Sequence, residues 1–204
     1  MTSERQEKLE RVLHKRQSAL TVVLENIEDP RNISAVMRSC DAVGIQDVYV
    51  INDRPVRERN WGFKSGRSAE KWVSLHYFDS VAACVQELRQ HYRQILTTRL
   101  SEDAVSVYQV DFTIPTALVF GNERKGVSDE MSALADGNII IPMAGMLQSL
   151  NISVACAVCI YEAYRQKQLA GHYDSPGLPE MRREELWKEW KAWSADENGL
   201  RTHQ

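Results

Sequence analysis

The segment from Ile139 to Asn151, I-I-I-P-M-A-G-M-L-Q-S-L-N, predicts a buried strand, a turn and the start of a helix. Three consecutive isoleucines are typical of a strand covered on both faces, as in a parallel sheet between two layers of helices. Open α/β sheets bind ligands in the loops at the carboxyl ends of such strands. This loop offers the hydroxyl of Ser149, the amide of Asn151 and free backbone groups. An ordinary strand–turn–helix connection has the same pattern, so this loop alone does not decide the function.

A second loop with polar chemistry, G-N-E-R-K-G, spans Gly121 to Gly126 and follows the strand-like segment Thr116–Phe120. Its two glycines allow a sharp turn and a close approach of the backbone to a ligand. Between them lie Glu123 and two cations. Ser128 is then the predicted N-cap of a short helix, because acidic residues follow it in the first turn.

A third loop, E-D-P-R-N-I-S-A-V-M-R, runs from Glu28 to Arg38 after the strand-like segment Thr21–Glu25. The apolar residues of the helix that follows fall on one stripe, and Arg38 projects from the opposite side, towards solvent or a ligand. Asn32 lies at the start of this helix, where asparagine commonly caps. A cap and a surface arginine would explain this loop equally well without any ligand.

Strand-like and helix-like segments alternate along the chain, which predicts a parallel sheet with helices on both faces. The predicted helices are Ser3–Ser18, Asn32–Val43, Ser80–Tyr92 (capped by Asp79), Asp129–Ala135 and Asn151–Ala170. The predicted strands are Thr21–Glu25, Asp47–Ile51, Gln94–Thr98, Thr116–Phe120 and Asn138–Pro142, and the stretch between Ile51 and Ser80 is expected to be less regular.

A Pro/Gly-rich break, D-S-P-G-L-P at Asp174–Pro179, predicts one domain over residues 1–173 and a helical extension with a tail over 174–204. The last helix carries a tryptophan-rich stripe, Leu186, Trp187, Trp190 and Trp193. That stripe could dock on its own subunit, join a subunit interface or contact RNA. Residues 194–204 are expected to form a disordered tail.

Charge is distributed unevenly although the formal net charge is −3. From Arg54 to Lys71 there are six cations against two glutamates, interleaved with Trp61, Phe63 and Trp72. Cations attract phosphates and planar side chains stack on exposed bases, whereas a solvated basic loop is the alternative. The candidate RNA-binding residues are Arg54, Arg57, Arg59, Lys64, Arg67 and Lys71, together with Arg11 in the basic N-terminal helix.

Composition indicates a cytoplasmic globular protein. The longest apolar run, Val154–Tyr161, is too short to span a membrane, and the charged N-terminus lacks the apolar core of a signal peptide. The four cysteines lie on helix-like stretches and are expected to pack in the core. Cys156 and Cys159 form a C-x-x-C without a second Cys/His pair, so no metal site is expected.

The three loops, in this order, resemble the motifs of the SpoU/TrmH branch of the SPOUT methyltransferases, and the resemblance covers most of the chain. N-I-S-A-V-M-R, G-N-E-R-K-G and I-I-I-P-M-A-G-M-L-Q-S-L-N-I-S-V-A carry it. The resemblance implies a homodimer that uses S-adenosyl-L-methionine and has a deep C-terminal trefoil knot. Within the branch, the chain is most similar to the TrmH enzymes, so the expected reaction is 2′-O-methylation of a guanosine in the D-loop of tRNA (Gm18-type).

The resemblance also implies roles for individual residues. Arg38 would act at the ribose hydroxyl or its neighbouring phosphate, and Arg165 would hold phosphate in its own or the partner's site. The residues expected to orient Arg38 and the nucleotide are Asn32, Glu123, Ser149 and Asn151. The cofactor would contact Leu100, Gly121, Ile141, Met143, Gly145 and Leu150. A valine at position 145 is expected to abolish cofactor binding by crowding a turn.

Two alternatives remain at this point. A methyltransferase of the same branch could act on ribosomal RNA or on another tRNA position. Those relatives often carry an additional N-terminal RNA-binding domain, whereas about twenty residues precede the first predicted strand here, which favours tRNA. A non-catalytic RNA-binding module would be expected to lack Arg38 or the Gly-Asn-Glu loop, and both are present. Neither DNA nor a membrane is expected as a partner.

Overall fold

Seven parallel strands form one sheet at the centre of the computed structural model, which describes residues 2–52 and 69–201. The order across the sheet is β3-β2-β1-β6-β4-β7-β5. The strands are β1 (Leu20–Glu25), β2 (Asp47–Ile51), β3 (Ser74–Phe78), β4 (Gln94–Thr97), β5 (Val105–Ser106), β6 (Thr116–Phe120) and β7 (Gly137–Ile140). The parallel sheet expected from the sequence is therefore confirmed.

The middle of the sheet is fully buried. Every residue of β1 and β6 is buried, and the two strands pair in register with Val22 beside Leu118. Such strands need apolar side chains on both faces, which is why T-V-V-L and T-A-L-V-F show no alternation of polar and apolar residues. Their carboxyl ends, at Glu25 and Phe120, lie side by side at one edge of the sheet.

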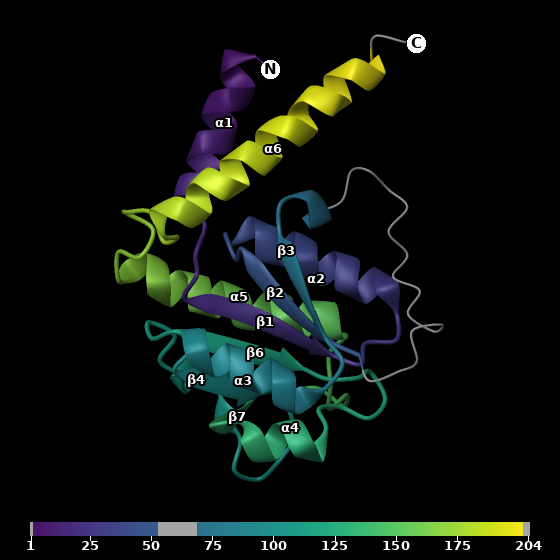
Figure 1. Cartoon of the computed structure of the whole chain (residues 1–204). Coiled ribbons are helices and arrows are strands. Elements are labelled where there is room, and N and C mark those ends of the chain that lie inside the picture. Colours follow the sequence, from purple (N-terminus) through teal and green to yellow (C-terminus); the bar gives the residue numbers. More distant parts are fainter. Residues whose placement is uncertain (1, 53–68, 202–204) are drawn as a thin grey trace.

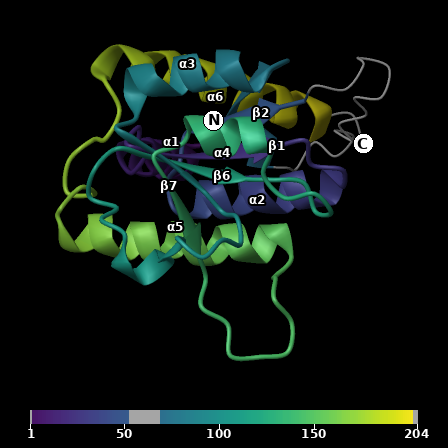
Figure 2. The same cartoon turned by 90° about the horizontal axis from the view of Figure 1, so that it is seen from below.

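Helices cover both faces of this sheet, as Figure 2 shows. Helices α2 (Pro30–Ala42) and α5 (Ile152–Leu169) share one hydrophobic cluster with the alternate residues of β1 and β6. Helices α3 (Val81–His91) and α4 (Asp129–Leu134) share a second cluster with the opposite face. The four cysteines are free and buried in these layers, which confirms their predicted role in packing.

Helices α1 (Ser3–His14) and α6 (Glu180–Arg201) lie side by side, apart from the sheet (Figure 1). Trp190 of α6 is buried with Leu9 and Leu13 of α1 in a third hydrophobic cluster. The buried guanidinium of Arg16 pairs with Asp41 of α2 and lies 5.3 Å from the centre of the Trp190 ring. The tryptophan-rich stripe therefore docks within its own subunit.

Two predicted helix caps were wrong by one to three residues. Asp29, not Asn32, caps α2, because its extended backbone lets the side chain accept a hydrogen bond from the Arg31 N–H at 2.9 Å. Ser80, not Asp79, caps α3 by accepting from the Ala83 N–H. Asn32 lies in the first turn of its helix, which leaves its side chain available for another contact.

Three further expectations needed correction. The segment before α3 was expected to be irregular, but it contains a 3₁₀ turn (Ala69–Lys71) and β3, which pairs with β2. The short β5 was not predicted, and a second 3₁₀ turn (Val107–Gln109) follows it. The expected tail from Ser194 is also wrong, because α6 continues to Arg201.

Lys167 on α5 is fully buried, and its Nζ has no hydrogen-bond partner in the described part of the chain. Burial lowers the pKa of this ammonium from 10.5 to about 8. Because the unfolded chain binds this proton more tightly, the free energy of unfolding should rise as the pH increases from about 8 to 10.5. We expect Lys167→Met to raise that free energy by about 2 kcal/mol at neutral pH and to flatten its pH dependence.

Chemical denaturation near neutral pH and near pH 10 would measure both effects of Lys167→Met. Lys188→Met, on the outer helix α6, is the control for loss of a lysine charge. A Lys167→Met protein that is less stable than wild type near neutral pH would contradict the buried-charge account.

Candidate active site

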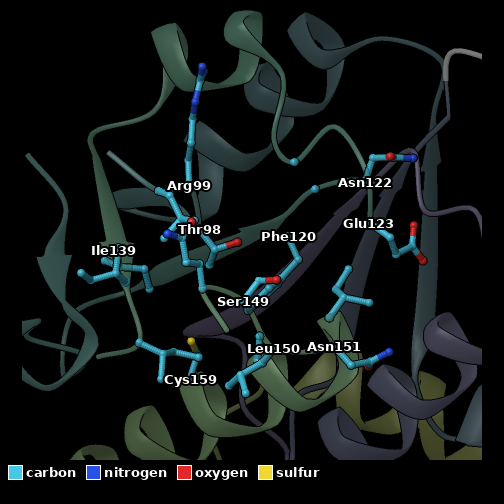
Figure 3. Close-up of a pocket in the computed structure, with 18 of the residues that line it drawn as sticks. Thr98, Arg99, Phe120, Asn122, Glu123, Ile139, Ser149, Leu150, Asn151 and Cys159 are labelled. Atoms are coloured by element: carbon cyan, nitrogen blue, oxygen red, sulfur yellow. The ribbon is translucent and has the colours of Figure 1, made fainter. Parts of the chain in front are cut away.

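A cavity of about 630 Å³ opens at the carboxyl edge of the sheet, beyond the ends of β4, β6 and β7 (Figure 3). Its walls come from three parts of the chain, residues 98–100, residues 120–126, and residues 139–141, 143 and 148–152, with Ala155 and Cys159 of α5 behind them. The volume is that of a small-molecule site, and the walls combine apolar residues such as Ile141 and Leu150 with polar ones such as Glu123 and Asn151. This edge is where the sequence placed a ligand site.

One hydrogen-bonded network ties the three predicted loops together beside the cavity. The Asn32 side chain donates to Glu123 Oε1 at 2.8 Å, and Asn151 Nδ2 donates to Asn32 Oδ1 at 3.2 Å. Glu123 also accepts from the backbone N–H groups of Glu28 and Asp29, at 3.1 and 3.4 Å. Figure 3 shows Glu123 and Asn151 on the same side of the pocket. The network fixes the first turn of α2 against the other two loops.

The Gly121–Gly126 loop is closed too tightly to admit a side chain at its first residue. A Cβ on Gly121 would lie 2.2 Å from the backbone of Gly126 and Val127. The Asn122 side chain accepts from the N–H groups of Arg124 and Lys125 and donates to the Asn26 carbonyl at 2.8 Å. The loop is therefore held in one shape, and its residues line the cavity.

Arg38 lies outside the cavity lining, about 9 Å along the axis of α2 from Asn32. It is exposed, as its helical position predicted, and makes no hydrogen bond or ion pair with a residue in the described ranges. The guanidinium is thus available to a ligand that reaches from the cavity over α2.

The sequence matches the SpoU rRNA Methylase family over residues 19–161. The chain belongs to this family. It is 44% identical to the tRNA (guanosine(18)-2′-O)-methyltransferase of Thermus thermophilus, over 88% of this chain and 92% of that protein. Among solved structures, the TrmH/SpoU tRNA modifying enzyme of Aquifex aeolicus superposes with a TM-score of 0.82 at 39% identity, over 95% of this chain and 96% of that one.

A second solved structure from the same family contains a cofactor. The SpoU methyltransferase AviRb of Streptomyces viridochromogenes, solved in complex with AdoMet, matches with a TM-score of 0.65 at 28% identity. The match covers 76% of this chain and 60% of that protein. The chain is therefore a SpoU-family methyltransferase, a class that depends on S-adenosylmethionine.

Most residues expected to contact the cofactor line the cavity: Leu100, Gly121, Ile141, Met143 and Leu150. Gly145 does not, because the connection between β7 and α5 extends away from the body (Figure 2). A Cβ on Gly145 would meet no atom within 4 Å, so the expectation that a side chain there crowds a turn is wrong for this chain. Crowding occurs at Gly121 instead.

Several lining residues were not predicted, among them Thr98, Arg99, Ile139 and Cys159. Thr98 and Arg99 lie at the carboxyl end of a strand, and in the sequence this position was the one indication that they could line a ligand site. Burial raises the pKa of the Cys159 thiol to about 12, so the thiol stays protonated and is a poor nucleophile.

Of the predicted RNA-binding residues, Arg54, Arg57, Arg59, Lys64 and Arg67 lie outside the described residues. Lys71 ends a 3₁₀ turn that packs near α2. Arg11 is exposed on α1. Two of the N-terminal cations make contacts within the protein. Arg16 is buried against Asp41, and Lys15 donates a hydrogen bond to the Tyr173 carbonyl.

Arg165 does not line the cavity of its own chain. It lies on α5, about 20 Å along the helix axis from Asn151, and pairs with Glu162 at 2.8 Å. Ser149, by contrast, lines the cavity together with Asn151. Within the described residues, no group of three or more His, Cys, Asp or Glu side chains could hold a metal ion, and no helix is long and apolar enough to cross a membrane.

Proposed function

We propose that this protein transfers a methyl group from S-adenosylmethionine to the 2′-oxygen of a guanosine in the D-loop of tRNA, at position 18. The network that joins Asn32, Glu123 and Asn151 supports this assignment, because it places the three loops of the family beside one cavity. The relatives from Thermus thermophilus and Aquifex aeolicus favour tRNA as the substrate. We place this activity in the cytoplasm, in a domain over residues 1–173 that carries a helical extension over 174–204.

The cavity suits S-adenosylmethionine in size and in the character of its walls. Leu100, Ile141 and Leu150 offer apolar surface, and Gly121, which has no side chain, lets the backbone of its loop approach a ligand closely. When bound there, the cofactor supplies an electrophilic methyl group on a positively charged sulfur. Met143, which lines the cavity, would contact it. We propose that the β7–α5 connection and α5 form the trefoil knot of the family.

Arg38 would position the target nucleotide for the reaction. An in-line transfer requires the 2′-oxygen to be held against the methyl group, and the hydroxyl proton must leave during the step. Because a guanidinium keeps its proton in proteins, Arg38 binds the adjacent phosphate, and that phosphate or a water molecule accepts the proton. Asn32, Glu123 and Asn151 fix the start of α2, and Ser149 faces the nucleotide across the cavity.

A homodimer would complete this site. Val154 and Tyr161 are half exposed on α5, and Leu169 is 77% exposed. At 100° per residue these side chains fall on one stripe of the helix, and Arg165 lies on the same stripe. A second copy that covers the stripe in a two-fold arrangement would bring the partner's Arg165 to the phosphates bound at this cavity. We assign Arg165 to the partner's site because it does not line the cavity of its own chain.

We expect the protein to have twice its monomer mass of 23.3 kDa in light scattering at micromolar concentration. Tyr161→Glu would place a charge on the α5 stripe and should shift the protein towards monomer. The matched control is Leu134→Glu, which changes a comparably exposed apolar residue on α4, across the sheet. A monomeric wild-type protein, or equal effects of the two variants, would contradict the proposed interface.

The function itself is tested on defined RNA. Purified protein is incubated with S-adenosylmethionine and an unmodified tRNA transcript, and nuclease fragments are analysed by mass spectrometry. The expected product carries one added methyl group on the ribose of guanosine 18. Replacement of that nucleotide by its 2′-deoxy form should abolish methylation. Methylation of a ribosomal RNA fragment but not of tRNA would assign the alternative substrate, and binding of RNA without methyl transfer would make the protein a non-catalytic module.

A further inference from the structure

The Asn138 side chain holds the part of the cavity wall that follows β4. The hydrogen-bonded ladder between β4 and β7 ends where Thr97 pairs with Asn138. Beyond that pair, the Asn138 side-chain amide makes the hydrogen bonds to β4 that a backbone residue of β7 would otherwise make. Its Oδ1 accepts from the Arg99 N–H at 2.7 Å, and its Nδ2 donates to the Arg99 carbonyl. A side-chain amide has the donor and acceptor of a peptide unit, so it satisfies both backbone groups of one residue.

Two further contacts complete this arrangement. Thr97 Oγ1 donates to Asn138 Oδ1 at 3.1 Å, and Nδ2 also donates to Ser101 Oγ at 2.6 Å. The amide therefore bridges residues on both sides of Thr98–Leu100, the segment that lines the cavity. The Arg99 guanidinium extends away from the cavity (Figure 3), where it pairs with Asp129. What this segment offers to a ligand is its backbone and the Leu100 side chain.

We infer that Asn138 is a positioning residue for the cofactor, which holds Thr98–Leu100 in the shape that S-adenosylmethionine binds. This inference rests on the proposed placement of the cofactor in the cavity. Without the amide, the N–H and C=O of Arg99 lose their partners and turn to water, so Leu100, already 64% exposed, loses its fixed orientation. The cost falls on cofactor binding rather than on the methyl-transfer step, because Asn138 does not line the cavity.

The test compares cofactor affinity in variants of two residues, Asn138 and Asp136, whose side chains bond to the backbone at opposite ends of β4. Calorimetric titration with S-adenosylhomocysteine should give about tenfold weaker binding for Asn138→Ala than for wild type. The KM for S-adenosylmethionine should rise by a similar factor, while kcat at saturating cofactor stays within about twofold. The control is Asp136→Ala. Asp136 accepts from the Ile95 N–H at 2.7 Å at the opposite end of the same strand pair, so its loss should lower stability but leave affinity unchanged.

Asn138→Asp keeps the volume of the side chain and provides a second variant. It retains the acceptor for the Arg99 N–H but sets an oxygen against the Arg99 carbonyl, so it should also bind the cofactor more weakly. The inference is overturned if the folded variants of Asn138 bind as wild type does, or if Asp136→Ala loses as much affinity as Asn138→Ala. If instead the Gly121→Val variant binds S-adenosylhomocysteine as tightly as wild type does, the placement of the cofactor in this cavity is overturned.

Discussion

Arg38→Ala should lower the single-turnover rate of tRNA methylation at least about 100-fold while the affinity for S-adenosylmethionine stays unchanged. The residue is exposed on α2 and has no partner among residues 2–52 and 69–201, so its removal leaves the core intact. The expected loss follows from its place on the exposed side of α2, about 9 Å along the helix axis from Asn32, where a ribose and its phosphate that extend from the cavity over α2 would contact it. Rapid-quench methylation of one transcript, with calorimetry for the cofactor, measures the two quantities.

Arg93→Ala is the matched control for Arg38→Ala. Arg93 is also exposed, but it lies at the amino end of β4, on the edge of the sheet opposite the cavity. Its loss should leave the methylation rate near that of wild type. Arg38→Lys adds a second comparison, since a lysine keeps the charge but not the planar fork that binds phosphate, and partial activity is expected. Near wild-type turnover by Arg38→Ala would show that another residue positions the nucleotide.

Gly121→Val should weaken cofactor binding about 100-fold, because a side chain there cannot fit beside the backbone of Gly126 and Val127. The Gly121–Gly126 loop would have to open, which displaces the wall of the cavity and the start of the segment that bears Glu123. Calorimetry with S-adenosylhomocysteine gives the affinity. Circular dichroism and thermal unfolding establish that the β6–α4 region is still folded.

Gly145→Ala is the comparison for this glycine, because a Cβ at that position meets open space. We expect it to bind the cofactor as wild type does. Equal losses at the two glycines would mean that the β7–α5 connection contributes to cofactor binding as much as the Gly121–Gly126 loop does. No loss at Gly121 would exclude the cavity as the cofactor site.

The strands that the sequence predicted best are those buried on both faces. β2 and β6 have the bounds that the sequence indicated, because four consecutive apolar residues in a short segment have few alternatives to a central strand. β3 was missed for the opposite reason. S-L-H-Y-F has no clear alternation and lies half buried at the edge of the sheet, where it is held by hydrogen bonds to β2 rather than by its own pattern.

The sequence by itself determined the chemistry of this protein: the family, the three polar loops, and the residues at their tips. Only the tertiary structure decided which of these residues meet. Asn32 was expected to cap its own helix, yet its side chain bonds to Glu123, 91 residues away, while Asp29 caps the helix. The role of Asn138 is equally invisible in the sequence. Local patterns report burial and backbone preference over a few residues. Hydrogen bonds between distant loops depend instead on which strands lie next to each other in the sheet.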